Sequence, residues 1–469
     1  MSNPSLKDYS IAELQKIKLH FIGIGGAGMS GIARIMLAKS IEVSGSDAKD
    51  SQILLSLKTL GAKISVGHSA ENIGDAQLVI VSAAIAENNP ELLAARKLGI
   101  PITSRATALS WLLTESTSIA IAGTHGKTTT TAMLTVALQS AGEDPSFAIG
   151  GTINSAGTNA HSGSGKFFVV EADESDGSFL AYKPSAAIIT NIEMDHVDHF
   201  QSEDQLFATF NDFISSIQSG GYLIICGDDP GCQRILTGMN LQGVQVITYG
   251  QNPENDFQLT RVNLAPTSSS ALVMQNGRKV GELNLVVPGL HNLLNALAAF
   301  AAANSLGVAV DRLLVGLKTF SGTRRRFELK GEVNSIKVID DYGHHPTELI
   351  VTLKAARNLV GAGSLYAVFQ PHRYSRTAVF AAEFAQALEA ADFVYLLEIY
   401  SASEKPMDGV SSLLISKKMN QSKVKFEPSM LQVVSDVSSA AKPGDLIILL
   451  GAGDVSSLSG PILEQLALN

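Results

Sequence analysis

Short apolar runs alternate with stretches of helical periodicity along most of the chain. The run Leu78–Val81 is apolar at every position, which is typical of a strand whose sheet is covered by helices on both faces. Strands of this kind that alternate with helices are typical of βαβ units. The pattern therefore predicts an α/β fold built on parallel sheets.

The alternation restarts twice, which predicts three α/β domains. The expected strands of the three blocks are Leu19–Gly23, Glu42–Val43, Leu78–Val81, Ser118–Ala122, Phe167–Val170, Ala186–Thr190, Gly221–Cys226, Lys337–Ile339, Ser364–Phe369, Phe393–Leu397 and Asp445–Leu450. Residues 250–287 show strand-like alternation and are predicted to form a small antiparallel patch. A length of 469 residues also fits about three domains of roughly 150 residues each. We place these domains at residues 1–107, 108–323 and 324–469.

Composition and charge narrow the class of protein. The chain has 35 Lys and Arg against 44 Asp and Glu, a net charge of −9, which argues against nucleic acid as the main partner. Cys226 and Cys232 are the only cysteines, as expected in a reducing compartment. The polar N-terminus shows no signal peptide, and no segment reaches about 18 uninterrupted apolar residues. We expect a soluble cytoplasmic protein without membrane insertion, either a monomer or a homodimer.

A glycine-rich loop follows the first expected strand. Its sequence GIGGAG runs from Gly23 to Gly28, and the helical stretch Met29–Ala38 comes next. Glycines let the backbone approach a pyrophosphate, and the helix N-terminus offers unpaired N–H groups to it. Asp47, 19 residues after Gly28, stands where an acid that binds ribose is expected. The loop predicts a diphosphate site, but leaves open whether the ligand is NAD or a nucleotide sugar.

A second loop, GTHGKT from Gly123 to Thr128, follows the expected strand Ser118–Ala122. The strict pattern G-x-x-x-x-G-K-[ST] would need a glycine where Ile121 stands. The rest of the loop keeps the backbone N–H groups that cradle phosphates, Lys127 for the β- and γ-phosphates and Thr128 for Mg²⁺. We expect Lys127→Ala to abolish activity and leave the fold intact, because a lysine in a surface loop contributes little to a core.

Acidic residues follow the next two expected strands of the second block. Glu171 comes directly after Phe167–Val170, where an enzyme with such a loop places a ligand of Mg²⁺. Asp173 and Asp176 fit a solvated acidic loop. His196 follows the next strand and is the candidate ligand of a second Mg²⁺, because the spacing of zinc sites is missing.

Histidine and arginine gather in later loops. The segment His291–Asn295 begins a helix, where its polar side chains could cap the helix or hydrogen-bond an adenine. Arg324–Arg326 form a basic cluster in an acidic protein, suited to the charge of a triphosphate or an acyl phosphate. Two further polar loops, beginning at Asp340 and Gln370, follow strands of the third block, where open α/β sheets bind ligands.

Taken in order, these motifs resemble the Mur ligase family of peptidoglycan synthesis. The resemblance covers nearly the whole chain through GIGGAGMSGIA, AGTHGKTTT, EADESDGSF, NIEMDHVDHF, PGLHNLLNALAA, GTRRRFE, DDYGHHPTE and FQPHRYSRT. It implies an N-terminal Rossmann-like domain for a UDP-sugar, a central P-loop ATPase-type α/β domain and a C-terminal Rossmann-like domain for an amino acid. Ala83 follows Ser82 where the family often has a second serine, which removes one hydroxyl.

The resemblance also implies a reaction. An ATP-dependent ligase would join the muramoyl carboxylate of UDP-N-acetylmuramate to L-alanine through an acyl phosphate, with two Mg²⁺ ions for which Mn²⁺ can substitute. The nearest rival is the related ligase that attaches a recycled tripeptide to the same acceptor. Two alternatives from other classes are an NAD-dependent oxidoreductase, based on the first loop alone, and a nucleotide-binding regulator without chemistry.

Carried over by motif, the resemblance assigns roles to residues of this sequence. The catalytic residues would be Lys127, His196, Arg325 and His344. The ATP-binding residues would be Gly123, Thr124, His125, Gly126, Lys127, Thr128, Thr129, His291, Asn292, Asn295, Arg325 and Asp341, with Arg324 as an alternative to Arg325. The substrates would contact Gly25, Gly26, Ala27, Gly28, Met29, Ser30, Asp47, Ser82, Tyr342, His344, His372 and Arg373. The metal ligands would be Thr128, Glu171 and His196.

Overall fold

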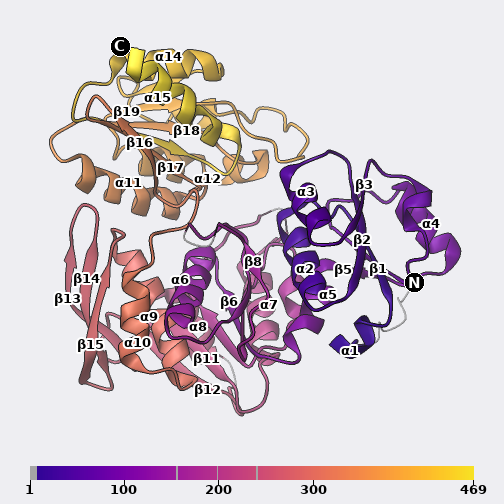
Figure 1. Cartoon of the computed structure of the whole chain (residues 1–469). Coiled ribbons are helices and arrows are strands. Elements are labelled where there is room, and N and C mark those ends of the chain that lie inside the picture. Colours follow the sequence, from indigo (N-terminus) through magenta and orange to yellow (C-terminus); the bar gives the residue numbers. More distant parts are fainter. Residues whose placement is uncertain (1–7, 155–156, 198, 239–240, 469) are drawn as a thin grey trace.

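The computed structural model describes residues 8–154, 157–197, 199–238 and 241–468, and these residues build three sheets. The sheets lie within residues 18–104, 117–285 and 328–450, here named the N-terminal, central and C-terminal parts. Figure 1 shows the N-terminal part (indigo) and the C-terminal part (orange to yellow) on different sides of the central part. The predicted fold class, α/β in three parts, is confirmed. The predicted domain boundary at residue 107 falls inside helix α5 (Arg105–Leu113) and stays a prediction.

The N-terminal part is a five-stranded parallel sheet in the order β3-β2-β1-β4-β5, which is the strand order of a Rossmann-like fold. Its strands are β1 (Lys18–Ile22), β2 (Glu42–Asp47), β3 (Lys63–Val66), β4 (Leu78–Val81) and β5 (Ile102–Ser104). Its helices are α1 (Ile11–Leu14), α2 (Ala27–Ala38), α3 (Gln52–Thr59), α4 (Pro90–Leu98), α5 and the 3₁₀ helix η1 (Ala70–Ile73).

The central part is a ten-stranded sheet in the order β15-β14-β13-β12-β11-β10-β6-β9-β7-β8. Its strands are β6 (Thr117–Ala122), β7 (Ser146–Ala148), β8 (Ala160–His161), β9 (Phe167–Glu171), β10 (Ala186–Ile189), β11 (Tyr222–Cys226), β12 (Gln245–Gly250), β13 (Phe257–Leu264), β14 (Ser269–Gln275) and β15 (Arg278–Leu285). Its helices are α6 (Lys127–Ser140), η2 (Ser178–Ala181), α7 (Glu203–Ser215), α8 (Pro230–Gly238), α9 (Leu290–Ser305) and α10 (Val310–Lys318). β13, β14 and β15 pair antiparallel, so the predicted antiparallel patch is confirmed.

The C-terminal part is a six-stranded sheet in the order β16-β17-β21-β18-β19-β20, parallel except for β16 at one edge. Its strands are β16 (Glu328–Val333), β17 (Ile336–Asp341), β18 (Leu365–Phe369), β19 (Phe393–Leu396), β20 (Val424–Phe426) and β21 (Leu446–Leu450). Its helices are α11 (Pro346–Val360), α12 (Tyr374–Leu388), α13 (Leu413–Ser416), α14 (Met430–Ala440), η3 (Asp454–Leu458) and α15 (Ser459–Leu468).

Apolar packing joins the first two parts more closely than the third. A single cluster of buried apolar side chains includes residues of both the N-terminal and the central part, among them Trp111 and Phe147. α2 packs on β8, where a Cβ on Gly31 would lie 3.0 Å from the Cβ of Ala160. The C-terminal part has two apolar clusters of its own. Among the described residues, no helix combines the length and the apolar character needed to cross a bilayer.

A buried carboxylate ties the N-terminal sheet to α4. Glu91, in the first turn of α4, accepts hydrogen bonds from the side chains of Ser46 and Asn72 and from the N–H of Ser69, and it pairs with His20 at 3.3 Å. Burial opposes the charge on Glu91, but these donors outweigh it and lower its pKa to about 2. The carboxylate therefore stabilises the fold in its ionised form.

We expect Glu91→Gln to lower the free energy of unfolding by up to about 3 kcal/mol at pH 7. The pKa of Glu91 falls from 4.5 to about 2 on folding, so its contribution is present above pH 4.5 and is lost as the pH falls towards 2. Urea unfolding can be followed by the fluorescence of the single tryptophan, Trp111. The difference in the free energy of unfolding between the wild type and Glu91→Gln should become smaller below pH 4.5. The exposed Glu87→Gln is the control. A difference of equal size at pH 7 and pH 3 would contradict the assignment.

Candidate active site

Two glycines shape the nucleotide loop, residues 123–128 between β6 and α6. Gly123 and Gly126 have φ of 124° and 83°, a region that favours glycine. A Cβ on Gly126 would lie only 2.7 Å from Oδ1 of Asn295, so the loop can approach α9 this closely only with glycine there. The N–H of His125 donates to Oδ1 of Asn191 (2.9 Å), which fixes the loop against the end of β10. The N–H groups of the first turn of α6 are thereby presented at the loop.

Lys127 is more deeply embedded than the sequence suggests. Its Nζ donates to the carbonyl oxygens of Gly123 and Thr124 and lies 2.9 Å from both carboxylate oxygens of Glu174. The side chains of Lys127 and Glu174 are only 11% and 1% exposed. Burial raises the pKa of Glu174 to about 7 despite the neighbouring ammonium group. The expectation that Lys127 is a surface lysine is therefore wrong, because its side chain is largely buried and forms an ion pair.

Two of the three predicted metal ligands contact each other. The hydroxyl of Thr128 donates to Oε1 of Glu171 (2.8 Å), and the N–H of Gly150 donates to Oε2 of the same carboxylate (2.7 Å). Glu171 ends β9, which pairs with β6 in register, so its carboxylate reaches the start of α6. The structure thus brings Thr128 and Glu171 together at one end of the sheet.

The third predicted ligand, His196, lies in a separate acidic group. Its Nε2 is 3.6 Å from Glu174, and the ligand atoms of Asp173, Glu174 and His196 lie within 4.8 Å of one another. Asp173 is half-buried and Asp176 is exposed, so only Asp176 fits the solvated acidic loop expected for both. His196 also has a positive φ of 49°, a strained conformation that points its side chain into this group.

A cleft of about 690 Å³ lies between the central and C-terminal parts. The predicted ATP-binding residues that line it are His125, Gly126, Thr129, His291, Asn292, Asn295 and Asp341. Asn292 donates to the carbonyl oxygen of Pro288 (2.7 Å), and burial lowers the pKa of His291 to about 4. The carboxylate of Asp341 accepts the N–H groups of Phe327 and Gly343, so it also shapes the two loops that border the cleft.

The three arginines of the basic cluster point in different directions. The guanidinium group of Arg325 donates to the carbonyl oxygen of Gly451 (2.6 Å), beyond β21, and Arg325 is not among the described residues that line the cleft. Arg326 lines the cleft and pairs with Glu348 at 3.2 Å, whereas Arg324 is exposed. A positive φ of 58° at Arg325 turns the chain between them. Of Arg325 and Arg326, only Arg326 therefore lines the cleft, whereas the role predicted for Arg325 at the nucleotide stays a prediction.

The residues predicted for the amino acid gather at the ends of β17 and β18. The ring centroids of Tyr342 and His344 are 5.2 Å apart, and those of His344 and His372 are 5.7 Å apart. Burial lowers the pKa of His344 to about 3 and that of His372 to about 4, so both imidazoles are neutral at pH 7. Arg373 has a φ of 70° and stands directly before α12. These four predicted residues form one polar group.

The first glycine loop lies at the end of β1. The N–H of Gly25 donates to Oδ2 of Asp47 (2.9 Å), so this carboxylate, predicted for a ribose, also holds the loop. Gly26 is the N-cap of α2, which begins at Ala27. Ser82, directly after β4, lies against the first glycine of the loop.

The first turn of α2 presents backbone rather than side chains. Met29 and Ser30 are 2% and 5% exposed, so their side chains offer little contact to a substrate, and the N–H of Ser30 already donates to the carbonyl oxygen of Gly26 (2.8 Å). A Cβ on Gly28 would lie 2.6 Å from a guanidinium nitrogen of Arg105, so the glycine makes room for this cation beside the loop. Arg105 was missed from the sequence because it stands far from the glycine motif along the chain.

Three family models match the chain in order. The Mur ligase family catalytic domain matches residues 18–117, the Mur ligase middle domain residues 121–303 and the Mur ligase glutamate ligase domain residues 325–453. The UDP-N-acetylmuramate–L-alanine ligase of Saccharopolyspora erythraea is 47% identical over 471 residues, covering 99% of this chain and 95% of the relative. The chain belongs to the Mur ligase family.

Solved structures of other Mur ligases share the fold. A UDP-N-acetylmuramate–alanine ligase from Thermotoga maritima is 30% identical with a TM-score of 0.80, over 96% of this chain and 99% of that one. A murein peptide ligase from Psychrobacter arcticus is 27% identical with a TM-score of 0.71 over the same shares. This Mur ligase is an ATP-dependent ligase of peptidoglycan precursor synthesis.

Arg376 lies beside the residues predicted for the amino acid, and the sequence reasoning left it without a role. Its Nε and Nη2 donate to Oδ1 of Asp195 (2.9 and 2.7 Å), and both side chains are 4% exposed. Its Nη1 lies 3.3 Å from Nδ1 of His372. Arg376 lies in the first turn of α12, three residues after Arg373, and this nearness in the sequence could have pointed to it.

Glu348 was also missed, although it connects two parts of this Mur ligase. Its carboxylate accepts the N–H groups of His344 and His345 (2.9 and 3.3 Å) and lies 3.3 Å from Nδ1 of His125 and 3.2 Å from Arg326. Burial opposes its charge, but these neighbours hold the pKa of Glu348 well below its usual range. Its position four residues after His344 was the signal in the sequence.

We expect Lys127→Ala to abolish ATP turnover and also to destabilise the fold, but by less than the about 3–5 kcal/mol of a broken buried ion pair, because Glu174, with a pKa of about 7, can take up a proton when its cation is removed. The double variant Lys127→Ala/Glu174→Gln should regain most of the stability and none of the activity. Phosphate release and thermal unfolding measure the two effects separately. A Lys127→Ala variant as stable as the wild type would show that the ion pair does not support the fold.

Proposed function

We propose that the chain joins L-alanine to the muramoyl carboxylate of UDP-N-acetylmuramate, with ATP cleaved to ADP and phosphate. The observation that carries this proposal is the 47% identity, over nearly the full chain, to a ligase named for these substrates. Contacts between the groups support it: Lys127 of the nucleotide loop lies on Glu174, and Asp195, beside His196, pairs with Arg376, which lies against His372. Each of the three substrates then has a candidate site on the chain.

The chemistry explains why ATP is needed. A carboxylate has no good leaving group, so one of its oxygens first attacks the γ-phosphorus of ATP, and ADP leaves. The amine of L-alanine then attacks the carbonyl carbon of the acyl phosphate, the amine loses a proton, and phosphate leaves from the tetrahedral intermediate. The protein contributes alignment and neutralisation of charge. In this proposal Lys127 turns from Glu174 to the β- and γ-phosphates.

Two groups of side chains fit divalent cations. The hydroxyl of Thr128 and the carboxylate of Glu171 are oxygen donors of the kind that Mg²⁺ prefers, and they are 2.8 Å apart. His196 would hold a second Mg²⁺, beside Asp173 and Glu174. The two ions, for which Mn²⁺ can substitute, would neutralise negative charge on the transferring phosphoryl group. The chain's own part is to hold these donors at the end of β9 and β10.

The cleft between the central and C-terminal parts is our proposed site for ATP. His291, Asn292 and Asn295 would face the adenine and Asp341 the ribose. Arg326, held by Glu348, replaces Arg325 as the arginine that we propose for the γ-phosphate. A guanidinium group suits this task because it stays charged and binds oxygen pairs.

The neutral His344 and His372 favour a site for the amine of L-alanine, because an uncharged imidazole can accept a proton and does not repel an ammonium group. Arg373 and Arg376 are proposed for the carboxylate of L-alanine, with Tyr342 beside them. The UDP-sugar diphosphate would lie on the N–H groups at Ala27–Met29, with Arg105 beside Gly28 as a cation.

The cellular location and the oligomeric state of the chain are also part of the proposal. We infer a cytoplasmic location, which is supported by the two buried free thiols, Cys226 and Cys232. We propose a monomer or a homodimer that acts on small molecules and not on nucleic acid, in keeping with the net charge of −9.

A matched pair of variants tests the arginine assignment. Arg326→Lys should lower kcat by about 10²–10³-fold, because one preorganised donor to the developing charge is displaced. Arg325→Lys should leave kcat within a few-fold and lower thermal stability, because Arg325 donates to the carbonyl oxygens of Gly451 and Gly453. Steady-state phosphate release and melting curves measure both. A larger loss of kcat in the Arg325 variant would reverse the assignment.

Phosphate release also tests the acceptor. With UDP-N-acetylmuramate and Mg²⁺-ATP, we expect release on addition of L-alanine and slower release with glycine or L-serine. An alanyl tripeptide should give none. Release with the tripeptide and none with L-alanine would instead assign the chain to the murein peptide ligases, whose fold it shares.

A further inference from the structure

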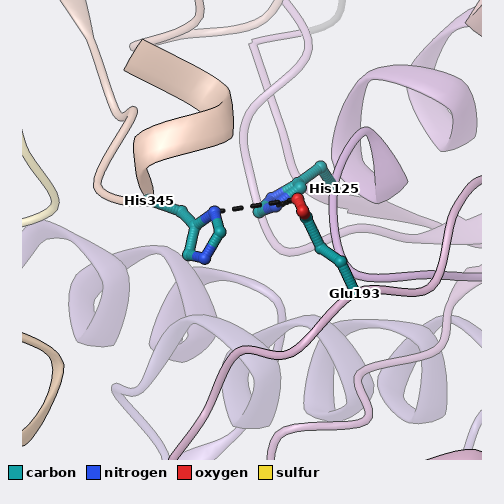
Figure 2. A group of neighbouring side chains, drawn as sticks. All are labelled: His125, Glu193 and His345. Carbon is teal, nitrogen blue, oxygen red and sulfur yellow. Dashed lines mark ion pairs between the residues drawn. The ribbon is translucent and has the colours of Figure 1, made fainter. Parts of the chain in front are cut away.

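His125, Glu193 and His345 meet where the central and C-terminal parts touch (Figure 2). His125 belongs to the nucleotide loop, Glu193 follows β10, and His345 stands directly before α11. Nε2 of His125 is 2.5 Å and Nδ1 of His345 is 3.7 Å from Oε1 of Glu193. The ligand atoms of the three residues all lie within 4.8 Å of one another.

Three observations separate this group from an ordinary polar contact. Two imidazoles and one carboxylate form the ligand set of open zinc sites. His345 is 4% exposed, and neither of its ring nitrogens has a hydrogen-bond partner among the described residues, which is costly for a buried polar group. Nδ1 of His125 faces the carboxylate of Glu348 at 3.3 Å, the arrangement that orients a histidine whose other nitrogen binds a metal.

We propose that Nε2 of His125, Oε1 of Glu193 and Nδ1 of His345 bind one Zn²⁺ ion, with water in the fourth position. Zn²⁺ with ligand bonds of about 2.0–2.1 Å needs tetrahedral ligand atoms about 3.3 Å apart. The distance of 2.5 Å between Nε2 of His125 and Oε1 of Glu193 must lengthen, and the distance of 3.7 Å between Nδ1 of His345 and the same oxygen must shorten. Each change is less than 1 Å. Two nitrogen ligands favour Zn²⁺ over Mg²⁺, whereas the Thr128–Glu171 pair offers only oxygen.

The ligands come from both parts of the chain, so the ion cross-links them. Glu193 and His125 belong to the central part and His345 to the C-terminal part. An ion that binds only when the two parts are in contact stabilises that arrangement by mass action. Zn²⁺ therefore acts as an inhibitor that holds the cleft in the arrangement seen here and slows the exchange of ligands.

The test is a titration of the full chain with Zn²⁺ against a chromophoric chelator, in saturating Mg²⁺ so that the oxygen sites are filled. We expect one Zn²⁺ per chain, and a melting temperature that rises with Zn²⁺. His345→Ala and Glu193→Gln should each weaken Zn²⁺ binding at least about tenfold, since even changes outside the ligands cost about that much. His161→Ala is the matched control, because it removes a partly exposed histidine of β8 that lies outside this group of ligands.

Three results would overturn the proposal. One is binding so weak that the chelator removes all Zn²⁺, and another is equal affinity in the wild type and both ligand variants. The third is loss of binding in Asp173→Asn with no loss in His345→Ala, which would place the ion at the acidic group beside His196.

In the wild type, Zn²⁺ should also inhibit phosphate release at lower concentrations than in His345→Ala. These binding readouts do not depend on which amino acid the ligase uses.

Discussion

Buried charge in the central part and at its junction with the C-terminal part is the constraint on which the site depends. Cations that will meet phosphates must be present before any phosphate arrives, and an unpaired buried charge costs several kcal/mol. The chain meets this constraint with carboxylates, since Lys127 lies on Glu174 and Arg326 on Glu348. In the proposed function, Lys127 would exchange Glu174 for the phosphates of the nucleotide, whereas Arg326 would meet the phosphates while Glu348 still holds it.

That exchange explains the unusual state of Glu174. With a pKa near 7, it is close to the midpoint of its titration at neutral pH. It can take up a proton at small cost when Lys127 turns to a phosphate, so the ammonium group is not shared between two anions. Glu348, in contrast, is held ionised by several neighbours and keeps Arg326 in place. One carboxylate is thus suited to give up its cation and the other to position it.

The same polar contacts decide how the parts are joined. The N-terminal and central parts share an apolar cluster, which can hold them as one unit. The C-terminal part has its own apolar clusters and meets the central part through directed contacts, such as Asp195 with Arg376 and Glu193 with Thr347. Ionic and hydrogen-bonded contacts can be replaced one for one by substrate groups, whereas apolar packing cannot. This division lets ligands compete with the junction and leaves the cores intact.

The amino-acid pattern predicted the strands that are apolar throughout, such as β4 and β18. A continuous apolar run of this length can be recognised in the sequence without knowing which strands pair with it. The pattern missed β3 and β5, which are short and partly exposed and gain their order from pairing at the flanks of β2 and β4. The motifs also located the loops of the site, because glycines and polar residues at strand ends are local features. They did not locate the pairings, which depend on tertiary contacts.

Backbone strain shows why the sequence could locate the loops of the site but could not predict which of their side chains face it. His196, Arg325 and Arg373 all adopt positive φ, a conformation that costs a non-glycine residue about 1 kcal/mol or more and persists only where its surroundings impose it. At Arg325 this single dihedral sends one arginine to the carbonyl of Gly451 and the next into the cleft. The sequence RRR carries no sign of that turn. Charge and spacing therefore predict that a cation stands at the cleft, and only the folded backbone decides which one.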